Sequence, residues 1–320
     1  MRIPRKLAAM QQRYVGNSGL RVSALSLGTM SWASETDEQD ATELLRTFVN
    51  AGGKHLDTAA SYGDGRSEAM IGSLLGDVVS RTEVSISTKA GMTTSDGRRT
   101  VDTSRGAMLA GLDASLARLG TDYVDLWFAQ AWDGNVPLEE TLSALEFALK
   151  SGRARYAGVS NFNGWQTAKA AAVAGFPLVA AQAEYSLLHR KPEAELIPAV
   201  EDAGLGLMAW APLGRGVLTG KYRGHIPADS RAAGVVLAPY VEPYLSQQPS
   251  RVVEAVAMAG KGLGRAPLDV SLSWLLSQHG VATAVVGPRT PVQLKEILDS
   301  QLTPLPPEIS RALEDVSGPS

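Results

Sequence analysis

Short apolar segments alternate along the chain with longer amphipathic ones. Eight of the apolar segments are predicted strands, because each is apolar at nearly every position instead of at every second one. Strands of this kind are buried on both faces, as in a parallel sheet covered by helices. The predicted strands span residues 24–29, 55–59, 84–90, 123–129, 155–160, 178–185, 204–211 and 283–287.

The amphipathic segments between them predict helices. Residues 37–52, for example, place Leu44, Leu45 and Phe48 on one helical face and close with Gly52, a residue that often ends helices. The predicted helices span residues 37–52, 104–120, 138–152, 163–175, 193–204, 251–264, 266–280 and 290–300.

A shorter pair of strands precedes this series. Residues 13–16 and 20–23 flank Asn17, Ser18 and Gly19, a turn cluster that predicts a β-hairpin. Strand starts then recur every 23–39 residues as far as the seventh strand, as expected of repeated βα units. Eight such units with right-handed crossovers favour a (β/α)8 TIM barrel over a doubly wound open sheet.

The interval before the eighth strand is longer than the others. Residues 214–243 are rich in Gly and Pro and predict a long loop over one face of the barrel. We expect residues 1–12 to form an N-terminal extension and residues 13–320 to form a single barrel domain. In such barrels the chemistry lies on loops at the carboxyl ends of the strands.

The composition narrows the class of protein. The 320 residues include 30 Lys and Arg against 33 Asp and Glu, a net charge of −3. This balance argues against binding to nucleic acid or to a membrane surface, which needs a basic excess. No apolar run approaches the roughly 18 residues of a membrane span. With 0 Cys there are no disulfides or zinc–thiolate sites, which also favours the cytoplasm.

The histidines do not suggest a metal site. His55, His189, His225 and His279 are scattered without metal-ligand spacing. We expect them to be surface residues or interior residues whose hydrogen bonds are satisfied, and we expect no bound metal.

Three polar residues follow two neighbouring predicted strands. Asp57 lies near the end of the second strand, Tyr62 lies in the loop after it, and Lys89 ends the third. In a barrel these strand ends converge. A buried Lys lowers the pKa of an adjacent Tyr, and a carboxylate keeps that Lys charged. Each residue alone has a structural explanation, but together they predict a proton donor for a developing alkoxide.

The motifs around these residues resemble those of the aldo-keto reductase superfamily, from Arg13 to about Val316. The resemblance rests on residues 56–75, 87–91, 158–162, 210–222 and 285–296, and on Gln182. It implies a (β/α)8 barrel that transfers hydride from the nicotinamide of NAD(P)H. It also implies that Tyr62 is the general acid and that Lys89, paired with Asp57, lowers its pKa.

The same resemblance implies where the nicotinamide binds. Ser160, Asn161 and Gln182 match positions near the carboxamide of the nicotinamide. Trp210 matches the aromatic residue that stacks on the nicotinamide ring.

It further implies that the coenzyme is NADPH or NADP+. Arg231 and Arg289 match positions that grip the adenosine 2′-phosphate, and the planar fork of Arg suits phosphate. The coenzyme contacts expected in all are Gly28, Thr29, Met30, Asp57, Ser160, Asn161, Gln182, Trp210, Ala211, Pro212, Leu213, Gly214, Gly216, Lys221, Arg231, Gly287, Arg289, Gln293 and Glu296.

The sequence departs from the family pattern at three positions. Gln130 falls where the fourth catalytic residue is usually His, and its amide can donate a hydrogen bond but cannot act as an acid. Members that resemble potassium-channel β subunits carry Asn there and turn over weakly, while steroid double-bond reductases carry Glu. Ala211 and Ile297 stand where Ser and Asn are common, so each removes a possible hydrogen bond to the coenzyme.

We therefore expect an NADPH-dependent oxidoreductase that reduces an aldehyde or ketone to an alcohol. Two alternatives stay open: a cofactor-binding regulatory or weakly active member, or a reductase of a conjugated C=C bond in a sugar or terpenoid intermediate. The expected contacts of the small-molecule carbonyl substrate are Trp32, Tyr62, Gln130 and Trp132. The sequence leaves the substrate and the oligomeric state open.

Overall fold

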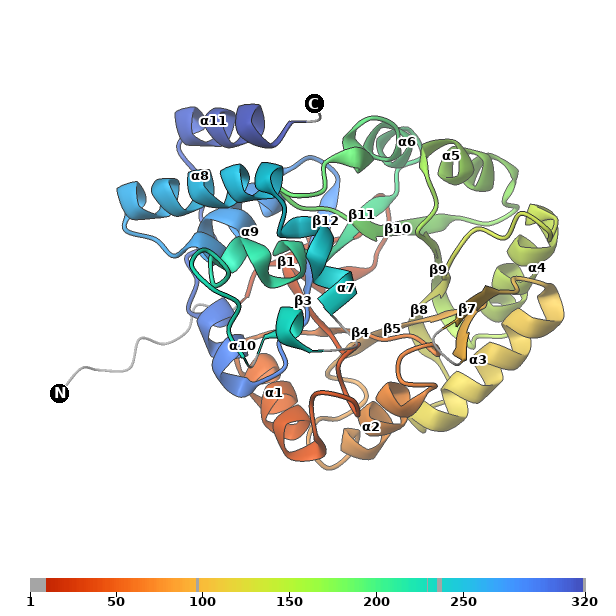
Figure 1. Cartoon of the computed structure of the whole chain (residues 1–320). Helices are drawn as coiled ribbons and strands as arrows, with labels where there is room; N and C mark the ends of the chain where they lie inside the picture. Colours follow the sequence, from red (N-terminus) through yellow and green to blue (C-terminus); the bar gives the residue numbers. More distant parts are fainter. Residues whose placement is uncertain (1–9, 96–97, 229, 235–237, 319–320) are drawn as a thin grey trace.

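The predicted strands close into a parallel barrel in the computed structural model, which describes residues 10–95, 98–228, 230–234 and 238–318 (Figure 1). The barrel strands are β3 (Leu25–Gly28), β4 (His55–Asp57), β5 (Ser85–Ala90), β8 (Val124–Ala129), β9 (Ala154–Ser160), β10 (Leu178–Glu184), β11 (Gly206–Trp210) and β12 (Val281–Val286). Their order around the barrel is β10-β11-β12-β3-β4-β5-β8-β9. This confirms the (β/α)8 barrel, with every strand end within two residues of its predicted place.

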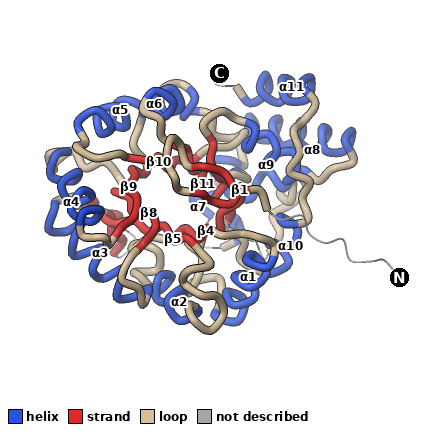
Figure 2. Tube along the Cα trace, turned by 180° about the vertical axis from the view of Figure 1, so that it is seen from behind, coloured by secondary structure: helices blue, strands red, loops and turns tan. Residues whose placement is uncertain are grey.

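Helices enclose this ring of strands (Figure 2). The predicted helices are present as α1 (Glu38–Asn50), α3 (Arg105–Leu119), α4 (Leu138–Lys150), α5 (Gly164–Val173), α6 (Leu196–Asp202), α8 (Gln247–Leu263), α9 (Pro267–Ser277) and α10 (Pro291–Leu298). Apolar stripes determine their orientation: α1 buries Leu44, Leu45 and Phe48 against the barrel, as predicted. Two further helices, α2 (Arg66–Leu74) and α11 (Pro307–Ser317), lie in segments for which the sequence analysis predicts no element.

The segment predicted as a long loop consists largely of short helical turns. These are η2 (Gly214–Thr219), η3 (Arg231–Ala233), α7 (Ala238–Val241) and η4 (Glu242–Tyr244), followed directly by α8. Figure 1 shows α7 in front of the strand ring. The segment is therefore a long loop that contains short helical turns, and it lies over one face of the barrel as predicted.

Two hairpins flank the barrel strands. β1 (Gln12–Tyr14) pairs with β2 (Arg21–Ser23), which confirms the N-terminal hairpin and starts it one residue inside the expected extension. The rest of that extension, residues 1–9, lies outside the described residues. An unpredicted hairpin of β6 (Met92–Ser95) and β7 (Arg98–Val101) follows β5.

The apolar residues pack in two layers, inside and outside the strand ring. Val15 and Val22 of the N-terminal hairpin pack inside the barrel against Phe128 and Met208, whereas Trp127 packs outside with the helices. The hairpin therefore fills one end of the barrel and leaves the carboxyl ends of the strands for polar side chains. Within the described residues, no helix has the length and apolarity needed to cross a membrane.

Candidate active site

A cavity of about 1540 Å³ opens at the carboxyl ends of the strands. It is walled by strand ends, by the loops that follow them, and by the segment over the barrel face. The predicted site residues that line it are Gly28, Thr29, Met30, Asp57, Tyr62, Lys89, Gln130, Ser160, Asn161, Gln182, Trp210, Ala211, Pro212, Leu213, Gly216, Lys221, Arg231, Gly287, Arg289, Gln293 and Glu296. The structure thus brings together residues spread over most of the sequence.

Three of the predicted site residues lie elsewhere. Trp32 is fully buried in the outer apolar layer. Trp132 packs edge-on against Phe162 and Trp165, with ring centres 5.3 and 5.0 Å away, and is not part of the cavity wall. Gly214 is buried beside Leu188 and also lies outside the wall.

Several residues that line the cavity are not among the predicted site residues. Met92 and Arg99 come from the β6–β7 hairpin, Arg215 from η2, and Tyr240 from α7, and Glu35 lies in the loop before α1. For the hairpin, an Asp-Gly dipeptide within residues 92–101 was the available signal.

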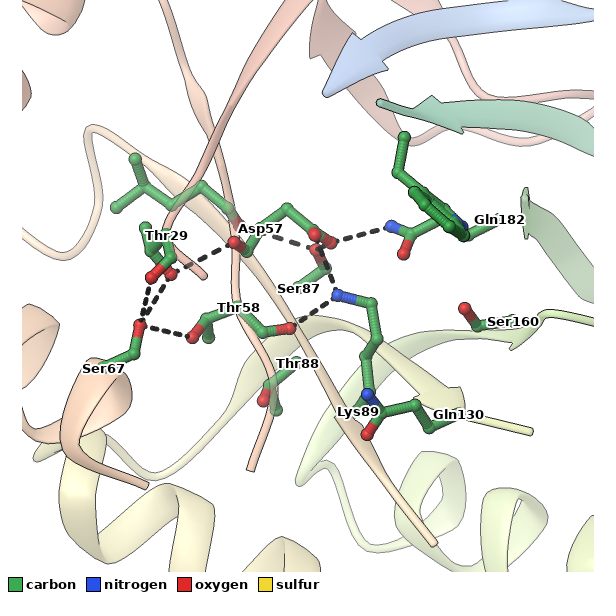
Figure 3. A network of polar contacts seen from close by, with 12 residues as sticks. Thr29, Asp57, Thr58, Ser67, Ser87, Thr88, Lys89, Gln130, Ser160 and Gln182 are labelled. Carbon is green, nitrogen blue, oxygen red and sulfur yellow. Dashed lines mark hydrogen bonds and ion pairs between the residues drawn. The ribbon is translucent and has the colours of Figure 1, made fainter. Parts of the chain in front are cut away.

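Asp57 and Lys89 form a buried ion pair at the floor of the cavity (Figure 3). Lys89 Nζ lies 2.8 Å from Asp57 Oδ2 and also donates to the carbonyl oxygen of Thr58 at 2.7 Å. The second carboxylate oxygen, Asp57 Oδ1, accepts from Ser87 Oγ at 2.6 Å and from Gln182 Nε2 at 2.8 Å. Each carboxylate oxygen therefore has a donor, which is what makes a buried charge tolerable.

Tyr62 lies next to this pair. The backbone N–H of Tyr62 donates to Ala59 O at 3.0 Å and closes a turn. The centre of the Tyr62 ring lies 5.1 Å from Lys89 Nζ. Burial by itself lowers the pKa of Lys89, but Asp57 and Tyr62 outweigh it and hold that pKa above its ordinary value. The Lys89 side chain is therefore a cation at neutral pH.

The pKa of Tyr62 shifts in the direction opposite to our prediction. Burial raises it above the ordinary value of 10.0, and this effect outweighs the lowering by Lys89. The contribution expected of Lys89 is present, but desolvation of the phenolate is larger. Tyr62 is therefore a protonated phenol at neutral pH, the form that a proton donor requires.

A buried histidine is linked to the ion pair through a hydrogen-bonded serine. His55 Nε2 lies 3.0 Å from Ser87 Oγ, and His55 Nδ1 lies 2.8 Å from Ser85 Oγ. Because Ser87 uses its hydroxyl proton on the Asp57 carboxylate, its oxygen accepts from His55 Nε2–H. Burial lowers the pKa of His55 to about 4, so the ring is neutral. This confirms the expectation of a satisfied interior histidine.

Gln130 lies at the end of β8 with its side chain buried. Its amide exchanges hydrogen bonds with the Ser61 hydroxyl, at 2.8 Å from Nε2 and 3.2 Å from Oε1. The backbone carbonyl oxygen of Gln130 accepts from Asn161 Nδ2 at 2.9 Å, and Asn161 Oδ1 accepts in turn from Trp210 Nε1 at 3.1 Å. Asn161 has a positive φ of 58°, a strained conformation of the kind found at functional sites.

Two arginines provide positive charge elsewhere in the cavity wall. The carboxylate of Glu35 lies 3.7 Å from the guanidinium of Arg289 and 4.0 Å from that of Arg231. Arg231 also donates to Gly287 O at 3.0 Å, and Gln293 accepts from the Arg289 backbone N–H at 2.9 Å. Both guanidinium groups lie in this part of the cavity wall, and guanidinium groups suit anions.

The comparisons with known proteins agree with this geometry. The profile described as "Aldo/keto reductase family" matches residues 24–317, nearly the whole chain. The chain belongs to the aldo/keto reductase family. Members act on small-molecule carbonyl compounds and generally use nicotinamide coenzymes, so the protein is an oxidoreductase.

The curated relatives carry both enzyme and channel names. "Uncharacterized oxidoreductase YrpG" of Bacillus subtilis (strain 168) is 34% identical over 96% of both chains. "L-glyceraldehyde 3-phosphate reductase" of Escherichia coli (strain K12) is 35% identical over 92% of this chain and 88% of its own. "Probable voltage-gated potassium channel subunit beta" of Oryza sativa subsp. japonica is 34% identical over 96% of both.

Proposed function

We propose that this aldo/keto reductase uses NADPH to reduce an aldehyde or ketone to an alcohol, with Tyr62 as the proton donor. The observation that carries the proposal is the Lys89 ammonium, which lies in a cavity wall between the Asp57 carboxylate and the Tyr62 phenol. A buried cation beside a protonated phenol has a clear chemical use. It stabilises the phenolate that remains once the proton has left.

The cavity fits a nicotinamide dinucleotide. Its volume of about 1540 Å³ exceeds the roughly 300–1,000 Å³ of a common small-molecule site, which leaves room for coenzyme and substrate together. Glycines line parts of the wall, where the lack of a side chain lets a ligand come close to the backbone. Gly28 has little room for a side chain, since a Cβ there would lie 3.0 Å from Val285, and Gly216 has a φ of +94°. Trp210 offers an aromatic face, and Arg231 and Arg289 offer charge to a 2′-phosphate.

Bound NADPH would supply the hydride, and the residues of the chain would supply the proton. Tyr62 Oη donates its proton to the carbonyl oxygen as negative charge builds there. Lys89 then stabilises the Tyr62 phenolate, and Asp57 keeps Lys89 charged and oriented. Gln130, fixed by Ser61 and lining the same wall, offers an uncharged amide to orient the carbonyl oxygen.

The direct test follows NADPH oxidation optically with 9,10-phenanthrenequinone and with 4-nitrobenzaldehyde, and identifies the alcohol product by mass spectrometry. We expect turnover that depends on both NADPH and the carbonyl compound. Absence of turnover with both substrates, while NADPH binding is demonstrated by quenching of Trp fluorescence, would contradict the proposal.

A weakly active or regulatory protein is the second candidate, and Gln130 is the observation that favours it. An amide held by Ser61 replaces the ionisable group usual at this position, and some relatives are named as channel subunits. Gln130→His distinguishes the candidates. If Gln130 is suited to catalysis, the variant turns over no faster than the wild type. A gain of about a hundredfold, the scale of one added acid–base group, would favour the second candidate.

The coenzyme preference is tested at Arg289. We expect Arg289→Ala to weaken NADPH binding about tenfold, since a guanidinium–phosphate contact is lost, and to leave NADH binding within twofold. The measurement is a fluorescence titration with each coenzyme. Equal losses for NADPH and NADH would show that Arg289 does not contact the 2′-phosphate.

A further inference from the structure

Arg99 is a cavity residue for which the proposed reaction has no use. It lies on β7, pairs with Thr94 of β6, and lines the same wall as Tyr62, Gln130 and Met92. The hairpin that carries it begins directly after β5, the strand of Lys89.

The hairpin is anchored where it leaves the barrel. Gly91 has a φ of +87°, and a Cβ there would lie 2.8 Å from Thr103 and 2.9 Å from Met108, so only glycine fits. Asp102 N–H bonds to Gly91 O at 3.1 Å and closes the base of the hairpin. The two strands are also joined by Thr93 and Thr100, whose hydroxyl oxygens lie 2.6 Å apart. These contacts hold the two strands together and attach the base of the hairpin to the barrel.

Among the residues that the structure describes, no carboxylate lies within ion-pair distance of Arg99. Two other carboxylates of the cavity wall do have partners: Asp57 pairs with Lys89, and Asp299 with Lys295. The charge of Arg99 nevertheless acts on the reacting group, because it opposes the effect of burial on the pKa of Tyr62.

Several uncharged side chains also line the cavity. Met30, Met92, Ala131 and Tyr240 line it, together with the neutral amide of Gln130. Arg99 itself is exposed, so a ligand that enters the cavity can reach its guanidinium. A guanidinium also matches a carboxylate or phosphate with two parallel hydrogen bonds.

We propose that Arg99 binds an anionic substituent, a carboxylate or a phosphate, carried by the carbonyl substrate. The substrate class is therefore an aldehyde or ketone that bears a negative group a few bonds from its carbonyl carbon. The inference rests on the proposed carbonyl reduction and adds its specificity.

The test compares matched pairs of aldehydes. 4-Carboxybenzaldehyde is paired with its neutral methyl ester, and glyceraldehyde 3-phosphate with glyceraldehyde, in the wild type, Arg99→Ala and Arg99→Lys. We expect kcat/KM for the anionic member of a pair to fall about tenfold in Arg99→Ala and less in Arg99→Lys, with the neutral member changing less than twofold. Arg46→Ala, an exposed arginine on α1, removes one positive charge away from the cavity and controls for net charge.

The pair that responds shows whether the group is a carboxylate or a phosphate. Equal losses for anionic and neutral substrates, or no loss for either pair, would overturn the role of Arg99. If the wild type reduces no carbonyl compound, the proposed function fails instead. Calorimetric binding of 4-carboxybenzaldehyde and of glyceraldehyde 3-phosphate in the presence of NADP+ then decides the inference alone: it stands if Arg99→Ala weakens binding of either compound about tenfold and falls if the two proteins bind both compounds equally.

Discussion

At the scale of single residues, the site is a chain of hydrogen bonds from a buried ring to a buried cation. Asp57, Tyr62 and Lys89 could be grouped from the sequence because parallel strands in a barrel end at one mouth. The direction of the net shift in the Tyr62 pKa could not be predicted from the sequence, because it depends on how far the folded protein buries the phenol. The hydrogen bonds that link His55 to Asp57 through Ser87 could not be predicted either, because the spacing of these residues in the sequence does not indicate them.

His55 should make the fold sensitive to acid. Its pKa is about 4 in the folded protein and 6.5 in an unfolded chain, so between these values the unfolded chain binds more protons. Stability from this group is therefore complete above about pH 6.5 and is lost as the pH falls toward 4. The difference corresponds to about 3 kcal/mol of unfolding free energy, at about 1.4 kcal/mol for each pH unit.

The measurement is urea unfolding of the wild type and His55→Gln at pH 7 and at pH 4. His55→Gln should be less stable at pH 7, because hydrogen bonds to Ser85 and Ser87 are weakened, and should lose about 3 kcal/mol less on acidification. An equal loss in both proteins would show that His55 does not stay neutral in the fold.

At the scale of elements, the hydrophobic pattern located the barrel strands and most helices but missed α2, α11 and the β6–β7 hairpin. The inner face of α2 buries Ser67 and Glu68, and Glu68 bonds to Thr88 of β5 and to Arg118 of α3. Only Ile71 and Leu74 complete that buried face, so the apolar stripe of α2 is short. The β6–β7 hairpin is rich in Thr, Ser and Arg and has no strand-like apolar alternation.

Gly72 shows how closely α2 packs on α3. A Cβ at this position would lie 2.2 Å from the carbonyl oxygen of Arg118, a backbone atom that cannot move alone. Gly72→Ala should therefore lower the free energy of unfolding by about 3 kcal/mol, although Ala is the better helix former.

Gly262→Ala is the matched control. Gly262 is exposed on α8 and has open space at its Cβ, so Ala should raise the free energy of unfolding by about 0.5–1 kcal/mol. Chemical denaturation of both variants checks the pair. Stabilisation by Gly72→Ala would mean that α2 and α3 separate easily.

At the scale of the whole molecule, the N-terminal hairpin and the catalytic residues occupy opposite ends of one barrel. Val15, Leu20 and Val22 of the hairpin segment fill the interior against Leu126 and Phe128, below the polar residues. The sequence predicted the hairpin but not this role, because a local turn signal carries no information about what the strands pack against.

Val22→Ala should lower the free energy of unfolding by about 2 kcal/mol, since two methyl groups leave a filled interior. Val173→Ala, at a position that is 47% exposed at the end of α5, should change it by less than about 0.5 kcal/mol. Denaturant titrations of the two variants give the comparison. Similar effects at both positions would mean that the hairpin is not part of the core.

The central claim is that Tyr62 donates the proton in NADPH-dependent carbonyl reduction. The most direct measurement is single-turnover NADPH oxidation with 4-nitrobenzaldehyde by the wild type and Tyr62→Phe, from pH 6 to pH 9. The wild-type rate should not depend on pH over this range, because burial raises the pKa of Tyr62 above 10.0 and keeps it protonated.

Tyr62→Phe should react at least about a hundredfold more slowly, the contribution of one proton donor, and should quench Trp fluorescence with the same NADPH affinity as the wild type. A rate within a few-fold of the wild type, with NADPH bound, would contradict the assignment of Tyr62 and with it the proposed chemistry of this site.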